Sequence, residues 1–372
     1  GFISSLVTTV CVILALQRPA HRIGLVDKPG GRKQHDGSIP LIGGIAIFLG
    51  FLTGLPFNGM DMLTLAGPLL GALALVLCGI YDDMRDMRSL HKLAVQALAA
   101  TALVLTADNG IIESLGRSFD GSQMLLGVLA IPFSILCVTG FINAVNMMDG
   151  IDGLTGGYAL VSLVGLFALI LLGGNTELIP AITVLAGATL GFLAFNFPYR
   201  KHRRKVFLGD AGSMLLGYLL AWFAITQTQQ DVGAIAIAPG AIAWILALPV
   251  IDTLSLMLRR MLNGRSPFSA DRNHMHHLCL RAGFTHRQTA LILLSGALVT
   301  VAVGFAGAYY RVPDLDRTTH PARTGRYGYG TKQEGYATAR TAGCPRTRAR
   351  PSGGLNWSTR ALEKEAGLRQ NA

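Results

Sequence analysis

The sequence predicts an all-α, polytopic membrane protein with about ten transmembrane helices, and three observations lead to this fold class. Of the 372 residues, 51% are hydrophobic and only 14% are charged, whereas a soluble domain carries about 25% charged residues. Ten apolar runs approach the ~20 residues that one helix needs to cross a bilayer. Basic residues gather in alternate connections between these runs, as expected for a membrane protein.

The apolar runs follow one another along the first 310 residues. Glycine and proline within such runs are tolerated, because neighbouring helices satisfy the backbone groups that these residues leave free. We expect the ten spans at residues 2–17, 39–57, 63–81, 90–107, 124–142, 158–172, 178–197, 211–226, 234–258 and 290–310.

The basic residues predict which connections face the cytoplasm. Nineteen Lys and Arg residues lie in or beside the connections that follow the odd-numbered spans, and one, Arg117, lies on the other side. The positive-inside rule makes the first set cytoplasmic. The net charge of +11 therefore reflects topology, and we expect no nucleic-acid partner. The basic run 200–205 can also attract anionic lipid or a phosphorylated substrate.

The last 62 residues differ from the rest of the chain. Residues 311–372 contain twelve Lys and Arg, many Gly, Thr and Pro, and no apolar run. After ten spans this tail would emerge outside, against the positive-inside rule. Either the count of spans is off, or the tail is disordered and exported, or it is aberrant sequence such as a reading-frame change near Val312 produces. We divide the chain into a membrane domain, 1–310, and this polar tail, 311–372.

Three acidic motifs border helix ends on the expected cytoplasmic face, and the first is DDMRDM. It places Asp82 and Asp83 directly after the third span. Adjacent carboxylates repel each other unless a cation neutralises them. Mg²⁺ favours a few carboxylates together with substrate phosphate oxygens. A polar helix end is an equally good interpretation of the pair alone. Lys92 follows close by, one turn into the fourth span.

The second motif is NAVNMMDGIDGL, residues 143–154. Residues three apart share a helix face, so Asn143, Asn146 and Asp149 are expected to form one polar stripe, with Asp152 following. This connection contains no Lys or Arg, so its carboxylates need a partner from elsewhere in the chain. An ordinary Asn/Asp turn after a helix is the alternative.

The third motif, FLGDAGS, places Asp210 at the entry to the eighth span. An aspartate there can be a helix N-cap, and the flanking glycines make a site for an anion or a metal equally suitable. Taken with the other two motifs on the same face, it favours a functional site. Ionisable groups at membrane depth are costly and usually functional.

Basic and imidazole groups from two further connections complete the expected site. The first connection carries His35, and the last carries Arg260 followed by His274, His276 and His277. Three histidines within four positions suggest zinc, but no fourth nitrogen or sulfur ligand is evident nearby. We therefore prefer these histidines and arginines as donors to phosphate.

Together the motifs resemble the polyprenyl-phosphate N-acetylhexosamine 1-phosphate transferases. The resemblance runs from about residue 23 to 310 and rests on DDMRDM, NAVNMMDGIDGL, KVFLGDAGS and SPFSADRNHMHH, in this order. The last motif resembles the bacterial N-acetylglucosamine branch of the family. The family would have an eleventh span where the polar tail begins.

The resemblance implies Mg²⁺, with Mn²⁺ as an alternative, held by Asp210 and the neighbourhood of Asn146. Asp82 and Asp83 would lie beside the metal and the phosphate of the acceptor lipid, undecaprenyl phosphate. Lys92 is expected to bind substrate.

The nucleotide sugar is expected at the second and last motifs. The resemblance implies that Asp149 and Asp152 help to hold UDP-N-acetylglucosamine and that His274, His276 and His277 contact its phosphates. His35, Asn143 and Arg260 complete the expected substrate-binding set.

The implied reaction transfers N-acetylglucosamine 1-phosphate to undecaprenyl phosphate, and UMP leaves. The product, undecaprenyl-pyrophosphate-GlcNAc, is the first lipid-linked intermediate of a cell-surface polysaccharide. The acceptor phosphate attacks directly, or a covalent aspartyl intermediate forms first. Another UDP-N-acetylhexosamine is an alternative donor, and a homodimer is compatible with the sequence. A secondary transporter is the main alternative function, but transport sites lie near the midplane of the membrane. A non-catalytic scaffold does not explain three acidic motifs on one face.

Overall fold

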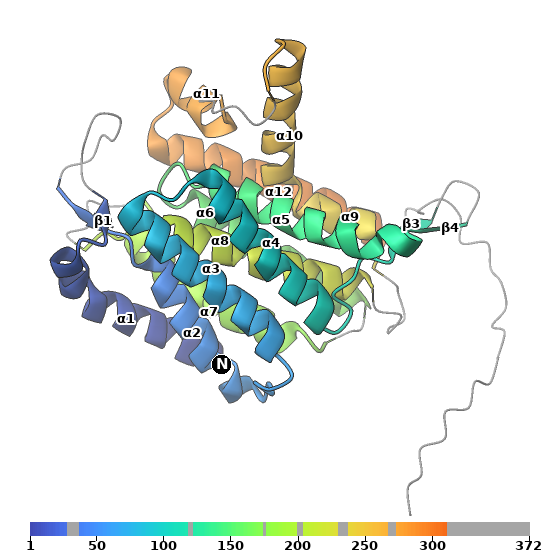
Figure 1. Cartoon of the computed structure of the whole chain (residues 1–372), viewed down its shortest axis with the longest axis horizontal. Coiled ribbons are helices and arrows are strands. Elements are labelled where there is room, and N and C mark those ends of the chain that lie inside the picture. Colours follow the sequence, from blue (N-terminus) through green and yellow to red (C-terminus); the bar gives the residue numbers. More distant parts are fainter. Residues whose placement is uncertain are drawn as a thin grey trace, which may run out of the picture. The chain divides into compact units, whose positions relative to one another are not determined.

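The computed structural model describes residues 1–27, 37–117, 122–173, 176–198, 204–229, 237–266 and 273–310 (Figure 1). They belong to one compact unit of the chain, Gly1–Thr318. The tail 311–372 and His35 lie outside the described residues.

The described residues form an all-α fold, which confirms the predicted class. The only strands among them make two small antiparallel pairs: β1 (Val26–Asp27) with β2 (Ile39–Pro40), and β3 (Ser114–Arg117) with β4 (Gln123–Leu125). The α-helices are α1 (Phe2–Ile23), α2 (Gly43–Gly54), α3 (Ala66–Arg85), α4 (Ser89–Thr106), α5 (Ala130–Met148), α6 (Leu154–Gly173), α7 (Ile179–Asn196), α8 (Gly209–Thr228), α9 (Pro239–Ile245), α10 (Ala247–Leu262), α11 (Met275–Arg281) and α12 (His286–Tyr309), with short 3-10 turns at Pro56–Asn58 and Gly127–Leu129.

The helices make this a multi-pass membrane protein. Within the described ranges, seven helices are long and apolar enough to cross a membrane, and the bent pair α9–α10 adds an eighth. Helix α2 is apolar but short. Helix α8 is long enough to cross, but it carries Asp210 near its start and Gln227 near its end. The exact number of spans, expected to be ten, stays a prediction.

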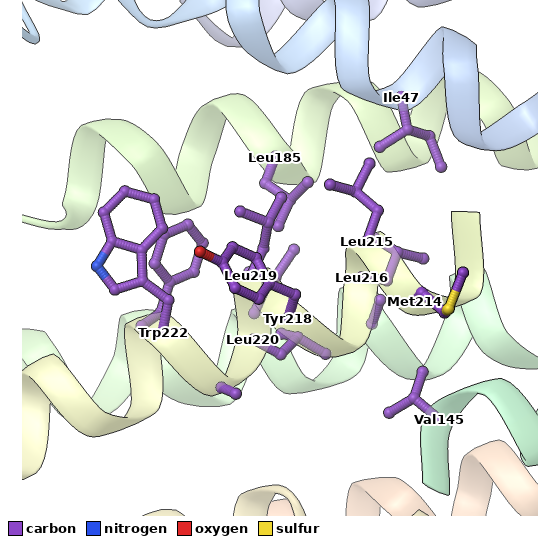
Figure 2. Packing of buried hydrophobic residues seen from close by; sticks show 14 of the residues in the cluster. Ile47, Val145, Leu185, Met214, Leu215, Leu216, Tyr218, Leu219, Leu220 and Trp222 are labelled. Atoms are coloured by element: carbon purple, nitrogen blue, oxygen red, sulfur yellow. The ribbon is translucent and has the colours of Figure 1, made fainter. Parts of the chain in front are cut away.

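Helix α8 lies at the centre of the hydrophobic core. Almost all of its side chains are buried, and they pack with Ile47 of α2, Val145 of α5 and Leu185 of α7 (Figure 2). A helix that is enclosed on all sides can carry polar groups at its ends, because protein rather than lipid surrounds them. Asp210 lies at the start of this enclosed helix, where its side chain is 33% exposed.

Glycines allow α2 and α3 to approach the first turn of α8. A methyl group at Gly44 would lie 2.2 Å from the backbone nitrogen of Gly212, and one at Gly79 would lie 2.2 Å from the Cα of Ala211. No side chain fits at either position. The contacts bring the end of α3, with Asp82 and Asp83, beside the start of α8.

The span predicted at 234–258 is not a single straight helix. The chain breaks at Leu246 into α9 and α10, which are bent by 79° relative to each other. Proline lacks the N–H that would bond to the carbonyl four residues earlier, and its ring clashes with that carbonyl. Pro249 therefore cannot continue the helix from Ile245, but it fits the first turn of a new helix. Helix α10 projects from the other helices, toward the region of α11 (Figure 1).

Candidate active site

Lys92 links two of the three predicted acidic motifs. Its ammonium lies 2.9 Å from Oδ2 of Asp82 and 2.6 Å from Oδ2 of Asp210. The side chains of Lys92 and Asp82 are only 15% and 8% exposed. The second oxygen of Asp82 accepts a hydrogen bond from the backbone N–H of Met87, at 2.6 Å. Asp82 thus has both carboxylate oxygens occupied and holds Lys92 in place from the end of α3.

Asp83 contacts the same cluster through the backbone. Its Oδ1 accepts a hydrogen bond from the N–H of Asp210 at 3.1 Å, one of the N–H groups that a helix leaves unpaired in its first turn. Its other oxygen, Oδ2, is buried and has no hydrogen-bond partner in the described part of the chain. This oxygen lies against Gly209, where φ is +72° and where a Cβ would come within 2.5 Å of it. Asp83 therefore offers one buried, unpartnered acceptor beside Asp210.

Asn146 brings the second motif to Asp210. Its amide nitrogen lies 2.7 Å from Oδ1 of Asp210 and 2.8 Å from Oγ of Ser213. Asn143 lies one turn earlier on α5. Helix α5 ends at Met148, so the expected polar stripe includes Asn143 and Asn146 but not Asp149. Asp149 instead belongs to the turn that follows the helix.

The turn after α5 carries Asp149 and Asp152. Burial raises the pKa of Asp149 to about 7, and the neighbouring carboxylates of Asp210 and Asp152 shift it in the same direction. Oδ2 of Asp152 lies 2.6 Å from Nζ of Lys205, so the basic run before α8 supplies the partner that this connection lacks. Gly153, at φ +76°, donates its N–H to Oδ1 of the buried Asn196 at 2.7 Å.

The histidine segment packs against this turn. A Cβ at Gly150 would lie 2.2 Å from Nε2 of His276, so the ring sits directly on the backbone at that position. Burial lowers the pKa of His276 to about 4, and the nearby rings of His277 and His274 act in the same direction. His276 is therefore neutral at physiological pH. The ring of His274 is buried beside Asp252.

The structure places most of the predicted site residues in two adjoining groups. One group is the network of Asp82, Asp83, Lys92, Asn146 and Asp210. The other group is the turn after α5 together with the histidine segment.

Three predicted residues are not part of the described contacts that define these groups. Asn143 lies one turn before Asn146 on α5. Arg260 is buried on the same face of α10 as Asp252, and His35 lies outside the described residues.

Sequence reasoning missed four residues that support these groups. Ser213 follows Asp210 by one turn, and Lys205 was interpreted only as part of a basic run. Asp252 could have been found from its position within an apolar stretch, because a carboxylate there is costly unless it is paired. Asn196 had no signal of this kind, because an asparagine near a helix end is ordinary.

The first group suits Mg²⁺. In the part of the chain that the structure describes, no three His, Cys, Asp or Glu side chains could together hold a metal ion. Mg²⁺ needs fewer protein ligands, because one or two carboxylates and substrate phosphates with water complete its shell. The donors here are hard oxygens: the carboxylate of Asp210, whose two oxygens contact Lys92 and Asn146 in this structure, and Oδ1 of Asn146. The unpartnered Oδ2 of Asp83 lies beside them.

Comparison with known proteins gives consistent matches. Residues 65–228 match Glycosyl transferase family 4. Over 306 residues the chain is 38% identical to the undecaprenyl-phosphate alpha-N-acetylglucosaminyl 1-phosphate transferase of Salmonella typhi, covering 82% of each chain. Over 309 residues it is 35% identical to the protein of the same name from Escherichia coli (strain K12), covering 82% of this chain and 83% of the relative. A probable undecaprenyl-phosphate N-acetylglucosaminyl 1-phosphate transferase of Bacillus subtilis (strain 168) is 33% identical over 295 residues, 79% of this chain and 80% of that one.

Proposed function

Because the chain belongs to the polyprenyl-phosphate N-acetylhexosamine 1-phosphate transferases of glycosyl transferase family 4, we propose that it transfers N-acetylglucosamine 1-phosphate from UDP-N-acetylglucosamine to undecaprenyl phosphate. The products are undecaprenyl-pyrophosphate-GlcNAc and UMP. The observation that carries this proposal is the cluster in which Lys92 bridges Asp82 and Asp210 beside Asp83 and Asn146.

Charge explains why such a cluster suits the reaction. Both substrates are anionic, so their phosphates repel each other as they approach. Phosphoryl transfer depends mainly on positioning and on electrostatic stabilisation of the transferred group. Lys92 supplies a positive charge whose position Asp82 and Asp210 fix. An ammonium that is already held in place needs no reorganisation when the phosphates arrive.

Asp83 is the carboxylate best suited to the acceptor phosphate. Both oxygens of Asp82 are occupied, whereas Oδ2 of Asp83 has no partner among the described residues. That oxygen can orient the acceptor or take its last proton. The acceptor is already largely ionised at neutral pH, so a strong base is not required. We assign Asp82 to the positioning of Lys92.

The turn after α5 and the histidine segment are assigned to the nucleotide sugar. Asp149 and Asp152 lie on this turn, next to the first group, and His276 packs against it. His277 is the more exposed of the two and is the better donor to a phosphate.

Mg²⁺ is the proposed cofactor, held by Asp210 with Asn146. When bound, it neutralises phosphate charge and orients the phosphoryl group. Mn²⁺ prefers the same oxygen donors.

We place the site on the cytoplasmic side of the bacterial inner membrane. Basic residues flank it on several elements, among them Lys205 before α8 and Arg259 at the end of α10. This arrangement is what the positive-inside rule expects of a cytoplasmic face. Nucleotide sugars are made in the cytoplasm, so a donor site there has direct access to them. The product would enter a surface-polysaccharide pathway such as O-antigen or cell-wall synthesis.

The test uses purified membranes with radiolabelled UDP-GlcNAc, undecaprenyl phosphate and Mg²⁺. We expect label in the butanol-extractable lipid together with release of UMP. Both should disappear with EDTA and in Asp210→Asn. Gly140→Ala serves as a matched control, because Gly140 is a helical residue on α5 with open space around it.

Other outcomes of this assay have distinct meanings. Label from a different UDP-N-acetylhexosamine would keep the reaction and change the sugar. Exchange of UMP into UDP-GlcNAc without the lipid would favour a covalent intermediate. If a folded preparation transfers no sugar phosphate from any UDP-sugar, the proposed function is wrong and transport becomes the next hypothesis to test.

A further inference from the structure

Asp252 is a buried carboxylate that the proposed reaction does not use. It lies on α10 and is only 4% exposed, on the buried face that it shares with Leu256 and Arg260. A carboxylate at such a position is costly unless it is paired. Both of its oxygens are engaged, and both contacts reach the histidine segment. Oδ2 lies 2.9 Å from Nδ1 of His274, and Oδ1 accepts the backbone N–H of Met275 at 2.9 Å.

These two contacts fix both a side chain and a backbone. Met275 is the first residue of α11, so its N–H has no partner within the helix, and Asp252 supplies one from another helix. The contact at Nδ1 sets the rotation of the His274 ring and leaves Nε2 on the side away from Asp252. A carboxylate on one ring nitrogen is a common way of fixing the orientation of a functional histidine.

Ring contacts connect His274 to the turn after α5. The rings of His274 and His276 are stacked, with centroids 5.8 Å apart and planes within 8°. His276 is 3% exposed and lies on the backbone of Gly150. Gly150 stands between Asp149 and Asp152, the two carboxylates of that turn. A continuous line of contacts therefore runs from α10 to the turn.

We propose that Asp252 is a positioning residue for the nucleotide sugar, an inference that rests on the function proposed above. From α10 it holds His274 and the start of α11, and through them it seats His276 against the Asp149–Asp152 turn. The bend between α9 and α10 gives α10 the direction that carries Asp252 to the histidine segment. Asp252 touches neither substrate and takes no part in proton transfer.

Steady-state kinetics of Asp252→Asn and Asp252→Ala test this inference. Asparagine keeps the shape and can still accept the Met275 N–H, whereas alanine loses both contacts. Because hydrogen bonds to a charged group are among the stronger ones, we expect the KM for UDP-GlcNAc to rise roughly 10- to 100-fold in Asp252→Ala and less in Asp252→Asn. The KM for undecaprenyl phosphate should not change. Thr253→Val is the matched control, because the neighbouring Thr253 hydroxyl is buried without a partner in the described chain.

A double-mutant cycle separates positioning from a general structural role. If Asp252 acts through His274, then Asp252→Ala combined with His274→Ala should be no worse than the more severe single variant. Each variant is first shown to be folded by size-exclusion chromatography and thermal unfolding. Additive effects, or equal rises in both KM values, would overturn the inference. Failure of the wild-type protein to transfer sugar phosphate would instead refute the proposed function.

Discussion

Asp82 and Asp83 are neighbours in the sequence, yet their surroundings prepare them for different tasks. The two carboxylate oxygens of Asp82 accept hydrogen bonds from Lys92 and from the N–H of Met87. One oxygen of Asp83 accepts a hydrogen bond from the N–H of Asp210, and the other has no hydrogen-bond partner among the described residues. Successive residues on a helix point about 100° apart, so the two side chains meet different neighbours. Two adjacent aspartates in a sequence therefore need not share one role.

Replacing these aspartates one at a time should give different kinetic signatures. Asp83→Asn should lower kcat by about 100-fold or more, because it removes the proposed orienting or proton-accepting oxygen. Asp82→Asn should cost about 10- to 100-fold in kcat/KM, because Lys92 loses a charged partner. Initial rates at saturating and at limiting acceptor distinguish the two. Equal losses in kcat for both variants would contradict the division of roles.

The buried ring of His276 predicts a pH dependence of stability. Its folded pKa of about 4 lies below the ordinary value of about 6.5. Between these values the unfolded chain binds a proton at residue 276 that the folded chain excludes, so stability falls as the pH is lowered through this window. At pH 5 the loss from this group amounts to roughly 2 kcal/mol relative to pH 7.

The measurement is thermal unfolding in detergent at pH 7 and pH 5. His276→Gln cannot titrate, so its unfolding temperature should drop less between the two pH values than that of the wild type. His286, the exposed first residue of α12, provides a comparison, since His286→Gln should leave the wild-type pH dependence in place. An identical drop in His276→Gln and wild type would show that the buried ring does not titrate as expected.

At the scale of helices, the site depends on close backbone approach. Helix α3 reaches the start of α8 through Gly79, which lies three residues before Asp82. Helix α2 reaches it through Gly44, and the segment before α8 is tied to the same region by hydrogen bonds from Gly43 N–H to Phe207 and from Gly44 N–H to Leu208. The first turn of α8, which carries Asp210, is thus held from several sides.

A single methyl group at Gly79 should disturb this arrangement. The obstacle is the backbone of Ala211, which cannot move aside as a flexible side chain can, and overpacking typically costs about 1–3 kcal/mol. Gly79→Ala should therefore lower both thermal stability and transferase activity. Gly140→Ala, at an open position on α5, should be neutral or slightly stabilising, because alanine favours a helix. Equal behaviour of the two variants in unfolding and activity assays would contradict the packing argument.

At the scale of the whole molecule, the described helices already contain the proposed site. All of its residues except His35 lie between positions 82 and 277 of the described ranges. Residues 311–372 lie outside the described residues. The division of the chain into a membrane domain, 1–310, and a polar tail, 311–372, stays a prediction from composition.

Truncation after Tyr310 should accordingly leave transferase activity intact. The expected result is an unchanged kcat/KM for UDP-GlcNAc in membranes with matched protein levels, because helices that precede the tail form the site. The comparison needs an expression control, such as an immunoblot against an N-terminal tag. Loss of activity at equal expression would mean that the tail completes the fold or the site.

The fold class, the family resemblance and most residues of the proposed site could be predicted from the sequence alone. Apolar runs of bilayer length and the bias of basic residues are properties of the chain alone, because lipid constrains length and charge directly. The acidic motifs predicted Asp82, Asp83 and Asp210, because clustered carboxylates beside membrane helix ends are costly unless they have a function. Asn146 was predicted from its spacing on the same helix face as Asn143.

Which of these residues contact one another, and through which atoms, depends on the tertiary structure. The ion pairs Lys92–Asp210 and Lys205–Asp152 join residues far apart in the chain, and no local pattern specifies such contacts. The break at Leu246 depends on where Pro249 falls relative to the helix before it, which hydropathy does not register. Asp252 gains its role in the same way, since a buried carboxylate is defined by the partners that the fold brings to it.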